Sequence, residues 1–167
     1  MARGPFGEGS AERVNLEYAG REEIPIGTDA VWAFVTDPTK IASCVPDMVE
    51  STVVDARTAD VIVQVAVGPV RGKLKMRITI DPRPDAHRLN LKISGGGFGS
   101  VVDVIAGADI TAETAAATAL DWKATVTMRG PVATVGGRVI DAQAKRVITQ
   151  TFENVKTRLT SAPAQAG

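Results

Sequence analysis

The chain has 167 residues, 44% of them hydrophobic, which suits one domain with one core and is too short to divide comfortably into two. Nineteen basic and nineteen acidic residues cancel, so no overall field draws the protein to nucleic acid or to another polyanion. The single cysteine, Cys44, excludes an internal disulfide and indicates a reducing compartment, for which the cytoplasm is the default.

The two ends of the chain lack a periodic apolar pattern. Residues 1–13 are rich in glycine and charge, and residues 161–167 are mostly small, so neither segment buries enough surface to offset the entropy of ordering. We expect disordered tails at 1–13 and 161–167 around a single domain, 14–160. No run approaches the roughly 18 apolar residues of a membrane-spanning helix, and the N-terminal segment lacks the apolar centre of a secretory signal.

The first part of the domain predicts a strand followed by two short helices. Residues 14–26 alternate loosely, as a strand near a sheet edge does. Thr28 is expected to cap a helix of about two turns that ends at Pro38. Asp37 then supplies a fresh cap, with proline at the first helical position, for a second helix through 40–44.

Residues 48–129 read as strands joined by turns. The cleanest alternation places Leu74, Met76, Ile78 and Ile80 on one face of a strand and Arg71, Lys73, Lys75 and Arg77 on the other. The next strand, around 88–94, ends at the glycine-rich interruption 95–100, and two further strands follow. Consecutive hairpins of this kind indicate an antiparallel meander.

The last element is a long helix predicted from about residue 133 to 159. Its apolar stripe is centred on Ala144 and holds Ile140, Val147, Ile148, Thr151, Phe152, Val155 and Leu159. Residues 137–159 would span about 35 Å at 1.5 Å per residue, and a ten-residue strand spans about 33 Å. The helix is therefore long enough to cross the whole sheet.

This order of elements predicts an α+β fold in which a curved antiparallel sheet of about six or seven strands wraps around the long C-terminal helix. A strongly curved sheet cannot touch a straight helix everywhere, so a tunnel is expected between them. Gly136 and Gly137, continued by Ala142 and Ala144, would thin the helix along that tunnel. The alternative is close backbone packing of the helix on the sheet with no cavity at all.

Three stretches carry a resemblance to a known family. They are IPIGTDAVWAFVTDPTKIASCVPD, VQVAVGPVRGKLKMRITI and GPVATVGGRVIDAQAKRVITQTF, and with the strands between them they cover roughly 16–158. The chain resembles the CoxG family of carbon monoxide dehydrogenase subunits, within the START-like, SRPBCC or Bet v 1-like superfamily, whose fold is the helix grip. Two departures are Asp47, where the family usually has glycine, and the loosely matching segment 95–110.

The resemblance implies a protein without catalytic machinery that holds an apolar ligand non-covalently. The ligand implied is a quinone of the menaquinone or ubiquinone type, or another isoprenoid lipid. The implied partner is a molybdenum-dependent CO dehydrogenase or related hydroxylase at the inner face of the cytoplasmic membrane. A cytoplasmic protein attached peripherally to that membrane follows as the expected location.

Candidate ligand-binding residues lie on the predicted apolar faces and at the glycine-rich interruption: Phe34, Met76, Ile93, Phe98, Trp122, Val126, Met128, Gly136, Ile140, Gln143, Ala144 and Val147. Gln143 and Gln64 are the candidate polar contacts for a carbonyl head group. Phe98 would lie on a lid over the cavity mouth, with a plain mobile hairpin loop as the alternative. A ligand burying about 300 Å² of apolar surface would gain roughly 7 kcal/mol.

Other residues offer little chemistry. The only histidine, His87, lies in a polar turn, so neither a histidine-based triad nor a histidine metal cluster can form. Cys44 fits a small buried hydrophobe better than a nucleophile. The cationic row Arg71, Lys73, Lys75 and Arg77 is a candidate docking face for anionic lipid or an acidic partner, with an ordinary solvated strand face as the alternative.

Three hypotheses follow from these observations. The first is a non-catalytic quinone or isoprenoid carrier that serves a CO dehydrogenase-type enzyme, in its membrane recruitment or in electron transfer from it. The second is a ligand-free recruitment factor that docks through the basic strand. The third is a small START-like cyclase or hydrolase, which requires acid–base groups inside the cavity.

Overall fold

The computed structural model describes residues 13–67 and 69–161. Its strands are β1 (Arg13–Ile24), β2 (Met48–Asp55), β3 (Thr58–Val67), β4 (Val70–Arg83), β5 (Arg88–Gly97), β6 (Ser100–Thr114) and β7 (Ala117–Arg129). Its helices are α1 (Thr28–Val35), α2 (Pro38–Ser43) and α3 (Gly137–Ser161), with short 3₁₀ helices η2 (Pro84–Ala86) and η3 (Pro131–Val135). The predicted tails, 1–13 and 161–167, lie outside the described residues except for Arg13 and Ser161.

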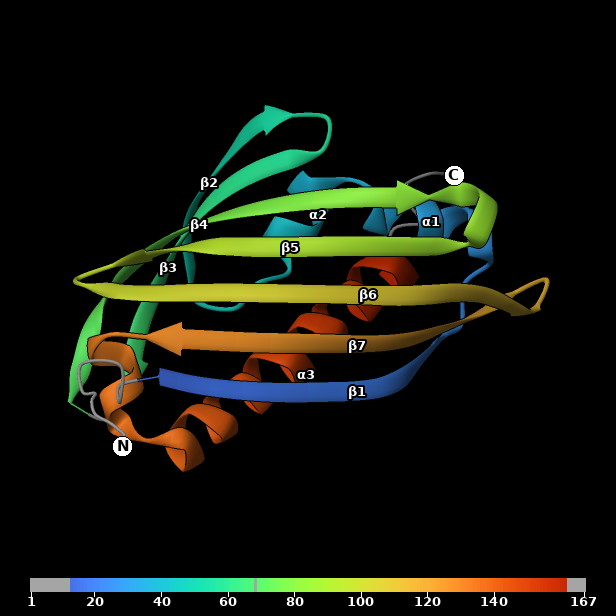
Figure 1. Ribbon diagram of the computed structural model, residues 1–167. Coiled ribbons are helices and arrows are strands. Elements are labelled where there is room, and N and C mark those ends of the chain that lie inside the picture. The colour runs from blue at the N-terminus through green and yellow to red at the C-terminus, as the bar shows by residue number, and fades with distance from the viewer. Residues whose placement is uncertain (1–12, 68, 162–167) are drawn as a thin grey trace.

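The seven strands form one antiparallel sheet in the order β1-β7-β6-β5-β4-β3-β2. Consecutive strands from β2 to β7 are neighbours, and β1 pairs with the last strand, β7, across twelve residues from Arg13 to Ile24. Figure 1 shows α3 lying across one face of this sheet, with α1 and α2 near the C-terminal end of α3. The predicted curved sheet wrapped around a long helix, with two short helices after the first strand, is confirmed.

The inner face of the sheet carries the core. In β4 the predicted alternation is confirmed, because Leu74, Met76, Ile78 and Ile80 are buried, while Arg71, Lys73, Lys75 and Arg77 are exposed. The register places Ile93 of β5 opposite Ile78 and Val104 of β6 opposite Ile93. Apolar side chains thus form continuous rows across neighbouring strands.

The two short helices begin by different means. Asp37 caps α2 as predicted, since its Oδ1 accepts a hydrogen bond from the Thr39 amide at 2.9 Å. The prediction for Thr28 is wrong, because Gly27 occupies the cap of α1 and the buried Thr28 hydroxyl has no hydrogen-bond partner among the described residues. Asp47, the departure from the family pattern, has φ +63° and forms an ion pair with Arg146 at 2.6 Å. Aspartate tolerates this left-handed conformation, so glycine is not needed there.

The glycines before α3 have a different role from the one predicted. Gly136 lies outside the helix with φ +97°, a backbone conformation that favours glycine, and Gly137 is the first residue of α3. A Cβ added at either position would meet nothing within 4 Å. Ala142 is exposed. The interpretation that these residues thin the helix over a tunnel is therefore wrong, and Gly136 instead provides the turn from η3 into α3.

The glycine-rich segment also differs from the prediction. Gly95, Gly96 and Gly97 continue β5, and only Phe98 and Gly99 form the turn to β6. A Cβ on Gly95 would collide with the backbone carbonyl of Lys75 on β4. The glycines thus permit a close approach of strands at this end of the sheet, and Phe98 lies at the tip of a tight hairpin.

Candidate functional site

The candidate site lies between the inner face of the sheet and α3. The helix is anchored near both ends, by Ile140 at 1% exposure and by Val155 and Leu159 at 4% each. Between these anchors, Val147 and Ile148 are only partly buried although they belong to the apolar stripe. Solvent therefore reaches the middle of α3 on the side that faces the sheet.

The sheet beneath this part of α3 is lined by small residues. One row of the register runs from Leu91 on β5 through Ala106 and Ala124 to Tyr18 on β1. Alanine fills little of the space that a large side chain would take, so the inner surface of the sheet is recessed at the two alanines relative to Leu91 and Tyr18. Leu91 and both alanines are partly exposed although they face inward. The hollow thus follows from side-chain size on the strands.

A cavity of about 330 Å³ opens in this region between α3 and the strands β1 and β7. Its apolar lining comes from Trp122, Ile148 and Phe152, and the rings of Trp122 and Phe152 lie 5.3 Å apart, centre to centre. The rest of the lining is mostly polar or charged and includes Tyr18, Glu22, Lys145, Thr149, Glu153 and Lys156. The volume is at the lower end of the range for small-molecule pockets, roughly 300–1,000 Å³, and accommodates a ring system rather than a long chain.

The Trp122 indole carries the one polar atom in the apolar lining. Its ring lies against Gly20 of β1, where an added Cβ would stand 2.9 Å from Cζ2. The Nε1 atom is buried and has no hydrogen-bond partner among the described residues. A buried donor without a partner is costly, and because Nε1 is covered by β1 at Gly20 it does not open to the cavity.

Two polar contacts join β1 to α3 on either side of the cavity. The Tyr18 hydroxyl donates to Asp141 Oδ1 at 2.7 Å, and Lys156 Nζ lies 2.9 Å from Glu22 Oε1. Burial, reinforced by Asp141, raises the pKa of Tyr18 far above its ordinary value. The Tyr18 hydrogen bond, followed by that of Lys145, lowers the pKa of Asp141. The phenol therefore stays protonated and the carboxylate ionised at neutral pH.

The predicted ligand-binding residues fall into three groups. One group lies on the inner face of the sheet or on α3: Met76, Ile93, Trp122, Val126, Met128, Ile140, Gln143, Ala144 and Val147; of these nine Trp122 alone lines the cavity, and Met76, Val126 and Ile140 are buried in the core. The second, Phe34, is buried in the core beside Lys40 and Arg158. The third, Phe98 and Gly136, lies in connections at one end of the sheet. Gln64 is exposed on β3 and donates to the Gly72 carbonyl instead.

Sequence reasoning missed the β1 side of the cavity. Tyr18 and Glu22 share a face with Gly20 in the alternation of residues 14–26, but the sequence gives no sign that β1 pairs with β7. Ile148 and Phe152 belong to the predicted stripe but were not assigned to the site. The signal that could have found them was their spacing of four residues, which places both on one side of α3.

The cationic row is divided by a salt bridge. Arg77 binds Asp60 through two hydrogen bonds, of 2.7 and 3.0 Å, across the outer face of β3 and β4. Arg71, Lys73 and Lys75 are exposed and form no ion pair within the described ranges. Three of the four predicted docking residues are therefore available to an external anion.

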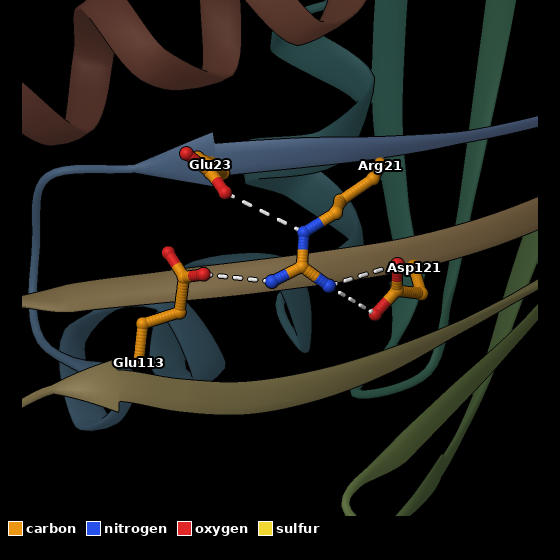
Figure 2. Close-up of polar contacts among 4 residues, drawn as sticks. All are labelled: Arg21, Glu23, Glu113 and Asp121. Carbon is orange, nitrogen blue, oxygen red and sulfur yellow. Dashed lines mark hydrogen bonds and ion pairs between the residues drawn. The ribbon is translucent and has the colours of Figure 1, made fainter.

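The largest ionic cluster of the outer face is structural. Figure 2 shows Arg21 of β1 in contact with Asp121 of β7, Glu113 of β6 and Glu23, at 2.9, 2.7 and 3.5 Å. These carboxylates raise the pKa of Arg21 further above its ordinary value, with Glu113 contributing most. The cluster joins β1, β6 and β7, because the Arg21 guanidinium is paired with all three carboxylates.

Several other features offer no site. The residues that the structure describes include no group of three or more metal-ligating side chains. Cys44 is fully buried, and burial raises the pKa of its thiol, as the prediction of a small buried hydrophobe requires. Of the helices in 13–67 and 69–161, none combines the length and apolar composition needed to cross a membrane.

Comparisons with known proteins agree with this architecture. Residues 20–160 match the family model of CoxG, a subunit of carbon monoxide dehydrogenase. A conserved protein from Geobacillus kaustophilus is 22% identical with a TM-score of 0.78, covering 88% of this chain and 97% of its own. The ZhuI aromatase/cyclase from Streptomyces sp. R1128 is 14% identical with a TM-score of 0.68, over 92% and 98%.

A START superfamily protein from Mycobacterium smegmatis is 12% identical with a TM-score of 0.64, covering 87% of this chain and 97% of its own. These identities show the fold alone, which is the START-like fold. The comparison with curated proteins gave no match.

Proposed function

The chain belongs to the CoxG family of carbon monoxide dehydrogenase subunits, and on that premise we propose that it is a non-catalytic binding protein for a quinone or another isoprenoid lipid. The ligand would lie in the hollow between the sheet and α3. The protein would serve a molybdenum-dependent CO dehydrogenase or related hydroxylase at the inner face of the cytoplasmic membrane, by recruiting the enzyme or accepting its electrons on the bound quinone.

The observation that carries the proposal is the cavity beside Trp122. Its apolar walls, Ile148, Phe152 and the Trp122 ring, suit a planar ring, and Lys156, which lines the cavity and carries three N–H donors, suits a carbonyl oxygen. A quinone presents both features in one head group. The partly exposed side chains Leu91 and Val104 extend the apolar surface across the inner face, where an isoprenoid tail would lie.

The polar groups beside the cavity favour binding over catalysis. Tyr18 is hydrogen-bonded to Asp141, and Glu22 is paired with Lys156. A general acid or base needs a pKa near the working pH, whereas Tyr18 and Asp141 have pKa values displaced away from neutrality. A cyclase or hydrolase reaction would have to break these pairs first.

Fluorescence titration with a menaquinone analogue of one isoprene unit tests the proposal. The Trp32→Phe variant leaves Trp122 as the only tryptophan, and quinone rings quench indole fluorescence on contact. We expect saturable quenching. Ile148→Phe, which fills the cavity, should weaken binding about tenfold, equivalent to about 1.4 kcal/mol.

The matched control is Ile105→Ala on the outer face, where Ile105 is 65% exposed. This variant should bind as tightly as the parent. Quenching that fails to saturate, or an equal loss in the two variants, would show that the ligand does not enter this cavity.

A further inference from the structure

Two charged side chains of the cavity form an ion pair with each other. Lys156 Nζ of α3 lies 2.9 Å from Glu22 Oε1 of β1, and both residues line the cavity. The other lysine of the lining, Lys145, pairs instead with Asp141, which lies outside the lining. Among the ion pairs of the described residues, Glu22–Lys156 alone therefore presents both of its partners to a ligand.

The pair borders the apolar part of the cavity. Lys156 follows Phe152 by four residues and so lies on the same side of α3. Glu22 shares a face of β1 with Gly20, against which the Trp122 ring lies. The side chains of Glu22 and Lys156 are 24% and 36% exposed. A ring seated beside Trp122 and Phe152 therefore has this partly buried ion pair as its polar neighbour.

The pair keeps the capacity both to donate and to accept further hydrogen bonds. The Lys156 ammonium carries three N–H donors, so it can hold Glu22 and a ligand oxygen at the same time. The Glu22 carboxylate contacts Lys156 through Oε1, and a carboxylate has a second oxygen that accepts. The Tyr18 hydroxyl, by contrast, already donates to Asp141. A ligand can therefore accept from Lys156 and donate to Glu22 without breaking the ion pair.

We propose that the Glu22–Lys156 pair makes the cavity bind the reduced form of a quinone, the quinol, more tightly than the quinone. The oxygens of a quinone only accept hydrogen bonds, so they use Lys156 and leave Glu22 without a ligand contact. A quinol hydroxyl both accepts and donates, and its hydrogen bond to a carboxylate is roughly twice as strong as one between neutral groups. The inference rests on the proposed function for the class of ligand and adds which redox form the site favours.

This preference changes the redox chemistry of the bound ligand. By thermodynamic linkage, a site that binds the quinol more tightly raises the reduction potential of the bound quinone. We expect the quinol to bind about tenfold more tightly, which is the lower end for a hydrogen bond to a charged group, because the pair is partly exposed. A tenfold preference corresponds to about 30 mV for a two-electron couple. The bound quinone would thus accept electrons more readily than the same quinone in solution.

Anaerobic isothermal titration calorimetry of the full chain tests this inference. The probes are the one-isoprene menaquinone analogue and the same compound reduced with dithionite. Glu22→Gln keeps the size of the side chain and removes its charge, so it should lower the preference for the quinol from about tenfold to less than about threefold. Lys156→Met should instead weaken both forms about equally, because both accept from the ammonium. A merely structural role of Glu22 would weaken both forms alike and leave their ratio unchanged.

The matched control is Asp60→Asn, which makes the same acid-to-amide change in the Asp60–Arg77 ion pair on the outer face of the sheet. It should retain the preference of the parent. Equal affinity of the parent for the two forms, or a full preference retained in Glu22→Gln, would overturn the inference and leave the proposed function standing. If neither form binds, the proposed function fails and the inference fails with it.

Discussion

Two isoleucines on α3 allow the presence of the hollow to be tested, by comparing how much each truncation lowers the free energy of unfolding. Ile140 and Ile148 are two turns apart on the same side of the helix. Ile140 is 1% exposed and packs in a cluster with Val132, Val14 and Leu16, whereas Ile148 is partly exposed and lines the cavity. Truncating each to alanine removes the same atoms, so the difference reports what surrounds them.

The expected costs differ severalfold. Ile140→Ala removes buried methyl groups and leaves a void, which costs about 3 kcal/mol within the usual range for such changes. Ile148→Ala enlarges a cavity that already exists and removes surface that water already reaches, so it should cost about 1 kcal/mol. For a domain of this size, each kcal/mol shifts Tm by roughly 2–4 °C. The first variant should lose about 6–12 °C and the second less than about 4 °C.

Urea unfolding followed by circular dichroism measures both free energies of unfolding. The m-values should match the parent, because neither change alters the compactness of the denatured chain. Equal destabilisation by the two substitutions would refute the reasoning, since it would mean that Ile148 is packed as tightly as Ile140 and that no hollow lies beneath the middle of α3.

Three further predictions concern single positions. Gly136→Ala should cost about 1–3 kcal/mol because alanine is strained at φ +97°, while Gly137→Ala at the first position of α3 should be neutral or stabilising, and thermal melts compare the two directly. Tyr18 is the only tyrosine, and because its pKa is raised in the folded protein it contributes stability below pH 10 that is lost as the pH rises toward the folded pKa. Absorbance at 295 nm should therefore show phenolate only well above pH 10. In the Asp141→Asn variant, phenolate should appear closer to pH 10. Cys44 should resist iodoacetamide at pH 8 until the protein unfolds, because the thiol is buried and its pKa is raised; fast alkylation of the folded protein would contradict its burial.

Local patterns predicted much of this fold because each depends on near neighbours in the chain. The alternation of β4 requires only the two-residue period, and the Asp37 cap requires only a carboxylate before Pro38. Thr28 shows the limit of this reasoning, since a hydroxyl in the right place still needs a backbone amide aimed at it. Gly136 shows a second limit of this reasoning, because its positive φ is set by the path that the chain takes from η3 into α3.

The site was less predictable because it depends on pairing between distant segments. Trp122 was recognised on an inward face, but its neighbours Tyr18 and Glu22 lie on a strand about a hundred residues earlier. Only the pairing of β1 with β7 brings them together. The same pairing sets Arg21 against Asp121 on the other face. A composition rich in alanine suggested room in the core without indicating where that room would be.

The most direct test of the central claim is an NMR measurement of where a quinone lies in the protein. With the isoleucine methyl groups labelled and the one-isoprene menaquinone analogue at saturation, intermolecular nuclear Overhauser effects should join the quinone ring to the Ile148 methyl groups and to the rings of Trp122 and Phe152. Effects that reach only outer-face residues such as Ile105, or none of these three side chains, would contradict the account.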